Sequence, residues 1–191
     1  MVESKLDFEF KGEVVKFDDT KFYTLFKSYQ PNGKGVDFIL KAKRMFMLLE
    51  VKNCKGFEKE NFWRTNVNTM NEDGEESFDI EIAKKVEGTL ACLVGAGVSD
   101  TLEAGQLKPF IEELILHKYE KGKNRIEVVL FLEGDFKTKT NDKKMIMKRI
   151  QDKIKIKLRW LSCTVRVVDS ESYRSIYYSV KEKSDNWNAQ K

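Results

Sequence analysis

Two acids and one lysine lie where two neighbouring apolar segments begin and end, and their types suit chemistry on phosphates. Asp37 opens the first segment, and Glu50 and Lys52 close the second. Both segments are too short for helices and are typical of adjacent strands. In a hairpin with an even-length turn centred between Lys43 and Arg44, Asp37 lies opposite Glu50, and Lys52 shares their face. The sequence therefore predicts two carboxylates and one ammonium side by side.

These residue types favour a divalent metal. Mg²⁺, or Mn²⁺, prefers hard oxygen ligands, typically one or two carboxylates with the remaining positions left for water and a substrate phosphate. Where the chain leaves the hairpin, we expect the Val51 carbonyl to be a further ligand. A bound ion lowers the pKa of a water molecule and neutralises charge on a phosphodiester. The lysine orients the attacking water or stabilises the developing charge.

Asp37 and Glu50-Val51-Lys52 resemble the motif of the PD-(D/E)XK nuclease superfamily, in which an Asp opens one strand and (D/E)-x-K lies on the next. The resemblance covers residues 18–168 in the order of elements but only four residues in motif. It implies a restriction-endonuclease-like α/β fold, with a mixed central sheet flanked by helices. It also implies that Asp37, Glu50 and Val51 hold Mg²⁺ or Mn²⁺, and that Lys52 assists the water.

The three-residue pattern alone is weak evidence, because acid-x-Lys recurs at Glu3, Glu9, Asp19, Asp135 and Asp142. Context distinguishes Glu50, since five apolar residues precede it. Asp37 also lies among apolar residues, where a carboxylate costs free energy unless something pairs with it. The competing interpretation is structural: a buried Asp37–Lys52 ion pair beside an exposed Glu50.

The superfamily often adds an acid from the first helix and a lysine from the helix after the motif. Candidates for the acid are Glu13, Asp18 and Asp19, of which we nominate Glu13 as an auxiliary residue. Lys85 is the candidate lysine because it borders the apolar face of its helix. A solvated pair between Lys85 and Glu81, four residues earlier, is the interpretation that the spacing favours.

Basic character is concentrated in one predicted helix. Residues 140–160 hold eight Lys or Arg and two Asp, a local charge of +6 in a chain whose total is +4. Such a stripe is typical of phosphate contacts, although an ordinary solvated helix face explains it equally well. We expect Lys148 and Arg149 on this helix, with Lys55 just past the motif, to bind nucleic acid, DNA rather than RNA.

Composition excludes several other function classes. One histidine, His117, cannot build a zinc site and leaves histidine-based catalysis to a single residue. Three cysteines without a CxxC pair argue against a disulfide framework, and the charged N-terminus and short apolar runs argue against a secreted or membrane-spanning chain. We therefore expect a cytoplasmic Mg²⁺-dependent DNA endonuclease. The alternative is a catalytically silent protein of the same fold that binds nucleic acid or protein, and a homodimer remains open in either case.

The elements expected to position these residues form one domain over 1–191, with a polar tail from about 182. Alternation around Gly12 predicts a strand or hairpin over 6–17. We expect further strands at 36–41, 46–51, 125–132 and 163–168, and helices at about 21–29, 79–94, 104–120 and 141–159. The helix over 79–94 is predicted to stop at Gly95-Ala96-Gly97 with a left-handed glycine.

Overall fold

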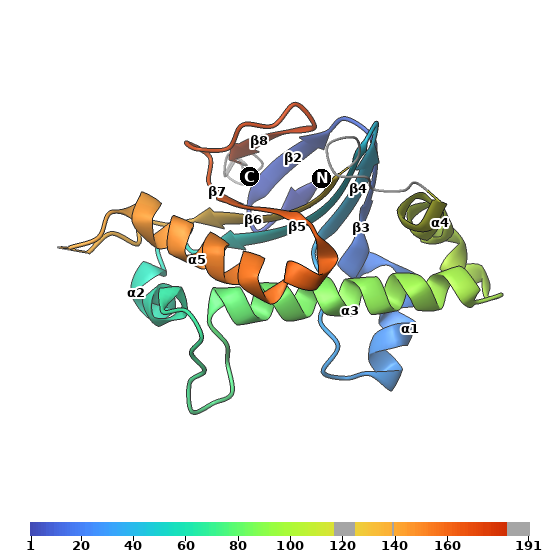
Figure 1. Ribbon diagram of the computed structural model, residues 1–191, viewed down its shortest axis with the longest axis horizontal. Coiled ribbons are helices and arrows are strands. Elements are labelled where there is room, and N and C mark those ends of the chain that lie inside the picture. Colours follow the sequence, from blue (N-terminus) through green and yellow to red (C-terminus); the bar gives the residue numbers. More distant parts are fainter. Residues whose placement is uncertain (117–124, 139, 183–191) are drawn as a thin grey trace, which may run out of the picture.

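The structure is a computed structural model that describes residues 1–116, 125–138 and 140–182. It is a mixed α/β arrangement of a five-stranded sheet, a three-stranded sheet and surrounding helices (Figure 1). The strands are β1 (Val2–Glu3), β2 (Leu6–Phe10), β3 (Glu13–Lys16), β4 (Phe38–Ala42), β5 (Met45–Asn53), β6 (Arg125–Glu133), β7 (Thr164–Val168) and β8 (Tyr178–Glu182). The α-helices are α1 (Lys21–Tyr29), α2 (Glu58–Asn61), α3 (Phe78–Val98), α4 (Lys108–Leu116) and α5 (Lys143–Lys157). Short 3-10 helices are η1 (Phe17–Asp19), η2 (Phe62–Thr65), η3 (Leu102–Gln106) and η4 (Arg159–Leu161).

The five-stranded sheet has the order β3-β4-β5-β6-β7. Its first three strands are antiparallel, whereas β5, β6 and β7 run parallel. The β4–β5 hairpin pairs Phe38 with Leu49 at one end and Ala42 with Met45 at the other, which confirms the predicted register. Arg44, the second residue of the two-residue turn, has a φ of 64° in the left-handed region.

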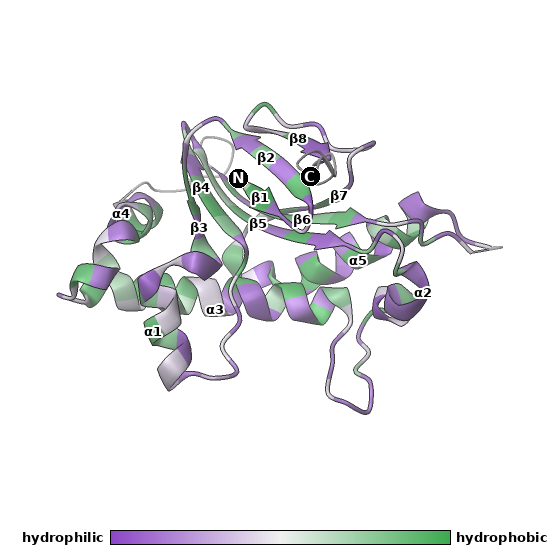
Figure 2. Ribbon diagram, turned by 180° about the vertical axis from the view of Figure 1, so that it is seen from behind, coloured by the Kyte–Doolittle hydropathy of each residue, from purple (hydrophilic) through white to green (hydrophobic). Residues whose placement is uncertain are grey.

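The two faces of this sheet are covered differently. α3 and α5 lie on one face and the sheet β1-β2-β8 lies on the other (Figure 1). On β5, Phe46 and Leu48 pack with the helices, whereas Met47 and Leu49 pack against the three-stranded sheet. Because strand side chains alternate, the positions that continue the row of Phe46 and Leu48 point toward the helices. Figure 2 shows that hydrophobic residues are concentrated in the central strands.

Most predicted elements are present with shifted ends. β6 is an interior strand that is buried on both faces, and α5 buries the predicted stripe at Ile146, Ile150 and Ile154. Among the described residues, no helix combines the length and apolar character needed to cross a membrane. The predictions for His117, for the end of the helix over 104–120 and for the tail beyond 182 lie outside the described residues.

The residues over 6–17 form strands as predicted, but the predicted hairpin is wrong. β2 pairs with β1 and β8, whereas β3 joins the other sheet by pairing with β4. The chain crosses between the sheets at Gly12, whose φ is 146°. A Cβ there would lie 2.7 Å from the Lys41 carbonyl oxygen, so the crossing requires glycine.

The predicted stop at Gly95-Ala96-Gly97 is also wrong, because α3 continues to Val98. The small residues Ala96 and Gly97 contribute to helix packing and do not end the helix. Ala96 is fully buried, and a Cβ on Gly97 would lie 3.1 Å from two side-chain carbons of Ile111 in α4. Glycine therefore allows α3 and α4 to approach closely.

Candidate functional site

The carboxylates of Asp37 and Glu50 lie on the helix-covered face of the sheet and share one ammonium group. Asp37 is 6% exposed and Glu50 is 1% exposed. Lys85 Nζ lies 2.5 Å from Glu50 Oε1 and 3.9 Å from Asp37 Oδ1. The other Asp37 oxygen, Oδ2, accepts a hydrogen bond of 2.7 Å from the Val51 amide. The interpretation of a buried Asp37–Lys52 pair beside an exposed Glu50 is therefore wrong.

Lys52 lies next to Glu50, as the alternation predicts. Its Nζ is 3.1 Å from Glu50 Oε1 and 3.0 Å from Glu81 Oε1. Arg64 from η2 binds the second oxygen of Glu81. Burial opposes the charge of Lys52, but the carboxylates of Glu50 and Glu81 outweigh it and raise the pKa of this lysine above its ordinary value. Lys52 is therefore a protonated donor held between two acids.

The interpretation of Lys85 as a solvated partner of Glu81 is wrong. The Lys85 side chain is 16% exposed and directs its ammonium at Glu50 and Asp37. Burial favours the neutral form of Glu81, but Lys52 and Arg64 more than compensate and lower its pKa. The carboxylate of Glu81 therefore forms an ion pair with Lys52 and not the predicted pair with Lys85.

α3 also positions the segment that leads into β4. The Thr89 hydroxyl accepts a 3.0 Å hydrogen bond from the Val36 amide and donates to the Lys85 carbonyl. Gly88 allows this close approach, because a Cβ there would lie 2.0 Å from the Lys34 carbonyl oxygen. Asp37 follows directly, so α3 orients both Lys85 and the acid that it contacts.

Two further acids extend the site. Carboxylate oxygens of Glu3 in β1, Asp18 in η1 and Asp37 lie within 4.8 Å of one another. The nomination of Glu13 is wrong, because its side chain is 54% exposed and pairs with Lys41 on the neighbouring strand. Of the three candidate acids Glu13, Asp18 and Asp19, Asp18 is the one whose carboxylate the structure places beside Asp37.

The carboxylates of this cluster are held at an electrostatic cost. Burial, reinforced by the negative charge of Glu50, raises the pKa of Asp37 to about 8. Burial also raises the pKa of Asp18. Among the described residues, the buried atoms Glu50 Oε2 and Asp18 Oδ1 have no hydrogen-bond partner. The free-energy cost of burying a carboxylate without a partner is offset when a cation binds to it.

The donor atoms are compatible with a hard divalent ion. They are carboxylate oxygens, the ligands that Mg²⁺ and Mn²⁺ prefer. The N–H and C=O of one strand residue point to the same side. Because the Val51 amide points at Asp37, the Val51 carbonyl faces that side too, as a ligand role requires.

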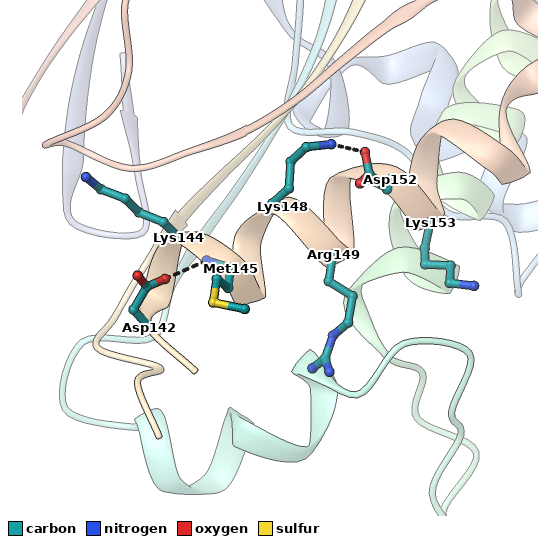
Figure 3. A pocket seen from close by; sticks show the side chains of 7 residues that line it. All are labelled: Asp142, Lys144, Met145, Lys148, Arg149, Asp152 and Lys153. Carbon is teal, nitrogen blue, oxygen red and sulfur yellow. Dashed lines mark hydrogen bonds and ion pairs between the residues drawn. The ribbon is translucent and has the colours of Figure 1, made fainter. Parts of the chain in front are cut away.

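The three predicted nucleic-acid contacts have different surroundings. Lys55 is half exposed and pairs with Glu133 and Glu182. On α5, Lys148 is exposed and pairs with Asp152. Arg149 donates to the Thr65 carbonyl, so it supports η2. Figure 3 shows these α5 side chains around a surface pocket of about 580 Å³, which is lined by Asp142, Lys144, Met145, Lys148, Arg149, Asp152 and Lys153.

Arg64, and the position of Glu81 beside Lys52, were not predicted from the sequence. Glu81 carried a weak signal as an acid near Lys85 on the predicted helix. Arg64 carried only the general signal of a basic residue among aromatic ones. Its guanidinium lies 4.6 Å above the Phe78 ring, a tertiary contact that the sequence pattern does not encode.

The chain belongs to the family of unknown function DUF6661, whose sequence profile matches residues 20–181. This range includes Asp37, Glu50, Lys52 and Lys85, whereas Asp18 lies just before it. No curated protein and no solved structure matches the chain.

Proposed function

We propose that this protein is a metal-dependent phosphodiesterase that acts on nucleic acid, most favourably a DNA endonuclease. The single observation that supports this proposal most is the convergence of Asp37, Glu50 and Lys52 at one end of a hairpin, with Lys85 between the two acids. Four functional groups meet on one face: Asp37 lies just before β4, Glu50 and Lys52 lie on β5, and Lys85 comes from α3.

The order and direction of the strands support a restriction-endonuclease-like fold. The antiparallel β4–β5 hairpin carries the motif, and α3 then leads through α4 to the parallel strand β6. That is the arrangement which the resemblance to the PD-(D/E)XK superfamily implies. Lys85 also lies where that resemblance expects a lysine on the following helix.

Asp37, Glu50 and the Val51 carbonyl would hold Mg²⁺ or Mn²⁺, with Asp18 close by. When bound, such an ion supplies a Lewis acid for the phosphodiester and a water molecule of lowered pKa. Lys52 keeps its proton because its pKa is raised, so it donates a hydrogen bond and does not act as the base. It orients the attacking water or stabilises negative charge on the phosphate. Glu81 holds the Lys52 ammonium in place, and Arg64 holds Glu81.

A catalytically silent binding protein of the same fold is the second candidate. The observation in its favour is that Glu50 already pairs with Lys52 and Lys85 inside the protein. Internal pairing of this kind leaves the buried charge of Glu50 compensated without a metal ion.

DNA nicking separates the two candidates. Wild type is incubated with supercoiled plasmid in Mg²⁺, in Mn²⁺ or in EDTA, beside Asp37→Ala and Lys52→Ala. Exposed Lys11→Ala is the matched control, and circular dichroism verifies folding. We expect metal-dependent nicking that both site variants reduce about 100-fold or more and that the control retains. Equal activity in wild type and site variants, or none in any metal, would reject the nuclease proposal.

A further inference from the structure

The ammonium group of Lys85 lies between the two acids that the proposed function assigns to a metal ion. Its Nζ is 2.5 Å from Glu50 Oε1 and 3.9 Å from Asp37 Oδ1. A bound Mg²⁺ ion lies about 2.0–2.1 Å from its oxygen ligands. An ion shared by the two carboxylates therefore needs the position that the ammonium holds, and the two cations exclude each other from it.

Lys52 also contacts Glu50, but a second acid holds it in place. Its Nζ is 3.1 Å from Glu50 Oε1 and 3.0 Å from Glu81 Oε1. Among the described residues, Lys85 is the lysine whose ammonium contacts both Asp37 and Glu50. Lys85 is therefore the cation that an incoming metal ion replaces.

The charges of the site favour this replacement. Three acids and three cations form one connected set of ion pairs, made by Asp37, Glu50 and Glu81 with Lys52, Lys85 and Arg64. Even with every acid ionised, a divalent ion added to this set leaves an excess of positive charge in a buried place, which costs free energy. Departure of the Lys85 ammonium removes one of these charges, so metal binding and the displacement of Lys85 favour each other.

Asp18 lies where it can receive the displaced ammonium. In the described part of the chain, its buried Oδ1 has no hydrogen-bond partner. One of its carboxylate oxygens lies within 4.8 Å of a carboxylate oxygen of Asp37, which Lys85 contacts. Asp18 and Lys85 also line the same pocket of about 620 Å³, which leaves room for the lysine side chain to rotate.

We infer that Lys85 is an internal counter-ion of the metal site, and that metal binding transfers its ammonium from Glu50 to Asp18. The inference rests on the proposed function and describes how its metal site is regulated. Only the molecules in which Lys85 has moved are competent to bind metal, and the apparent affinity is reduced by that fraction. Removal of the lysine should therefore tighten metal binding, although Lys85 stabilises the metal-free protein.

Mn²⁺ binding to the full chain tests the inference, with the free ion measured by electron paramagnetic resonance at one pH and salt concentration. Wild type is compared with Lys85→Met and Lys85→Gln, and circular dichroism verifies folding. Glutamine keeps a hydrogen-bond donor for Glu50 and removes only the charge, so it replaces the Met variant if that variant does not fold. Lys84→Met is the matched control, because Lys84 is exposed on the same helix and pairs with Glu76.

We expect both Lys85 variants to bind Mn²⁺ about tenfold or more tightly than wild type, as for a competent state that makes up about a tenth of the molecules or less. Lys84→Met should bind as wild type does. Affinities of the Lys85 variants equal to or weaker than that of wild type would overturn the inference.

Asp18→Asn tests the destination of the ammonium. It should weaken Mn²⁺ binding several-fold more in the wild-type background than in Lys85→Gln, where no ammonium needs a new partner. Equal weakening in both backgrounds would show that Asp18 acts on the ion itself, and would overturn the transfer.

Wild type crystallised with Mn²⁺ provides a readout that needs no variant. The Lys85 ammonium should lie beside Asp18 and no longer contact Glu50, whereas a bound ion with Lys85 still on Glu50 Oε1 would overturn the inference.

The same measurements keep the two proposals apart. Mn²⁺ binding without DNA nicking rejects the proposed function, and the affinities of the Lys85 variants then decide the inference alone. If wild type binds no Mn²⁺, binding that appears only in the Lys85 variants supports the inference. Absence of binding in wild type and in both variants would overturn both proposals.

Discussion

Replacement of Asp37 by Asn changes the charge of the site while preserving its shape. The Asn side-chain oxygen keeps the hydrogen bond from the Val51 amide, which is 2.7 Å long in the wild type. The substitution removes a negative charge that lies beside Glu50 in a buried position. Without metal, we expect Asp37→Asn to stabilise the protein at alkaline pH.

The raised pKa of Asp37 gives the sign and the size of this effect. The folded protein holds the Asp37 proton up to pH about 8, whereas the unfolded chain releases it near 3.8. The stability that this proton contributes is complete below pH ~4 and is lost as pH rises through about 8. At ~1.4 kcal/mol per pH unit, the full difference is roughly 5 to 6 kcal/mol. The attraction of Lys85 is already included in this difference, and relaxation of the buried site offsets part of the rest, so we expect about 2–3 kcal/mol.

Urea unfolding followed by tryptophan fluorescence measures this difference in EDTA at pH about 5 and about 9. Asn does not titrate, so Asp37→Asn should exceed wild type in unfolding free energy by about 2–3 kcal/mol at the higher pH and by much less at the lower pH. Asp100→Asn, at an exposed position, serves as the control and should show no such trend. A variant that is less stable than wild type at both pH values would refute the conclusion that the Asp37 charge is costly.

Two other substitutions test how the site is held together. Lys85→Met leaves Glu50 with one lysine fewer. Because breaking a buried ion pair is costly, the substitution should lower the unfolding free energy at neutral pH by about 2–3 kcal/mol. Unchanged stability would contradict the role of Lys85 as the partner of Glu50. Gly88→Ala places a methyl group against the Lys34 carbonyl and should cost ~1–3 kcal/mol in the same urea experiment. Gly105→Ala, which meets open space, should stay within ~0.5 kcal/mol, and equal effects of the two would show that close approach at Gly88 is not required.

The hairpin register could be predicted because local rules determine it. Both faces of β5 are buried, so the two-residue turn at Lys43-Arg44 determines the pairing of Phe38 with Leu49 and of Ala42 with Met45. That pairing places Asp37 near Glu50 before any tertiary contact is known. The neighbouring position of Lys52 follows from the alternation of side chains along the strand.

Contacts between distant elements could not be predicted this way. The spacing of four residues along the helix predicted Glu81 as the partner of Lys85. Because α3 packs against the sheet, the Lys85 side chain contacts Glu50. Glu13 matched by residue type, yet its strand directs it to Lys41 at the sheet edge. The sheet β1-β2-β8 joins the two ends of the described chain, and such pairing leaves no short-range pattern in the sequence.

The proposed function requires Asp37 and Glu50 to bind one divalent metal ion beside Lys52. Crystals of wild type and Asp37→Asn soaked in Mn²⁺, with data collected at the manganese edge, test it most directly. We expect an anomalous peak that contacts carboxylate oxygens of both acids in wild type and disappears in the variant. Absence of a peak between the two acids in wild type, or a peak that persists undiminished in Asp37→Asn, would contradict it.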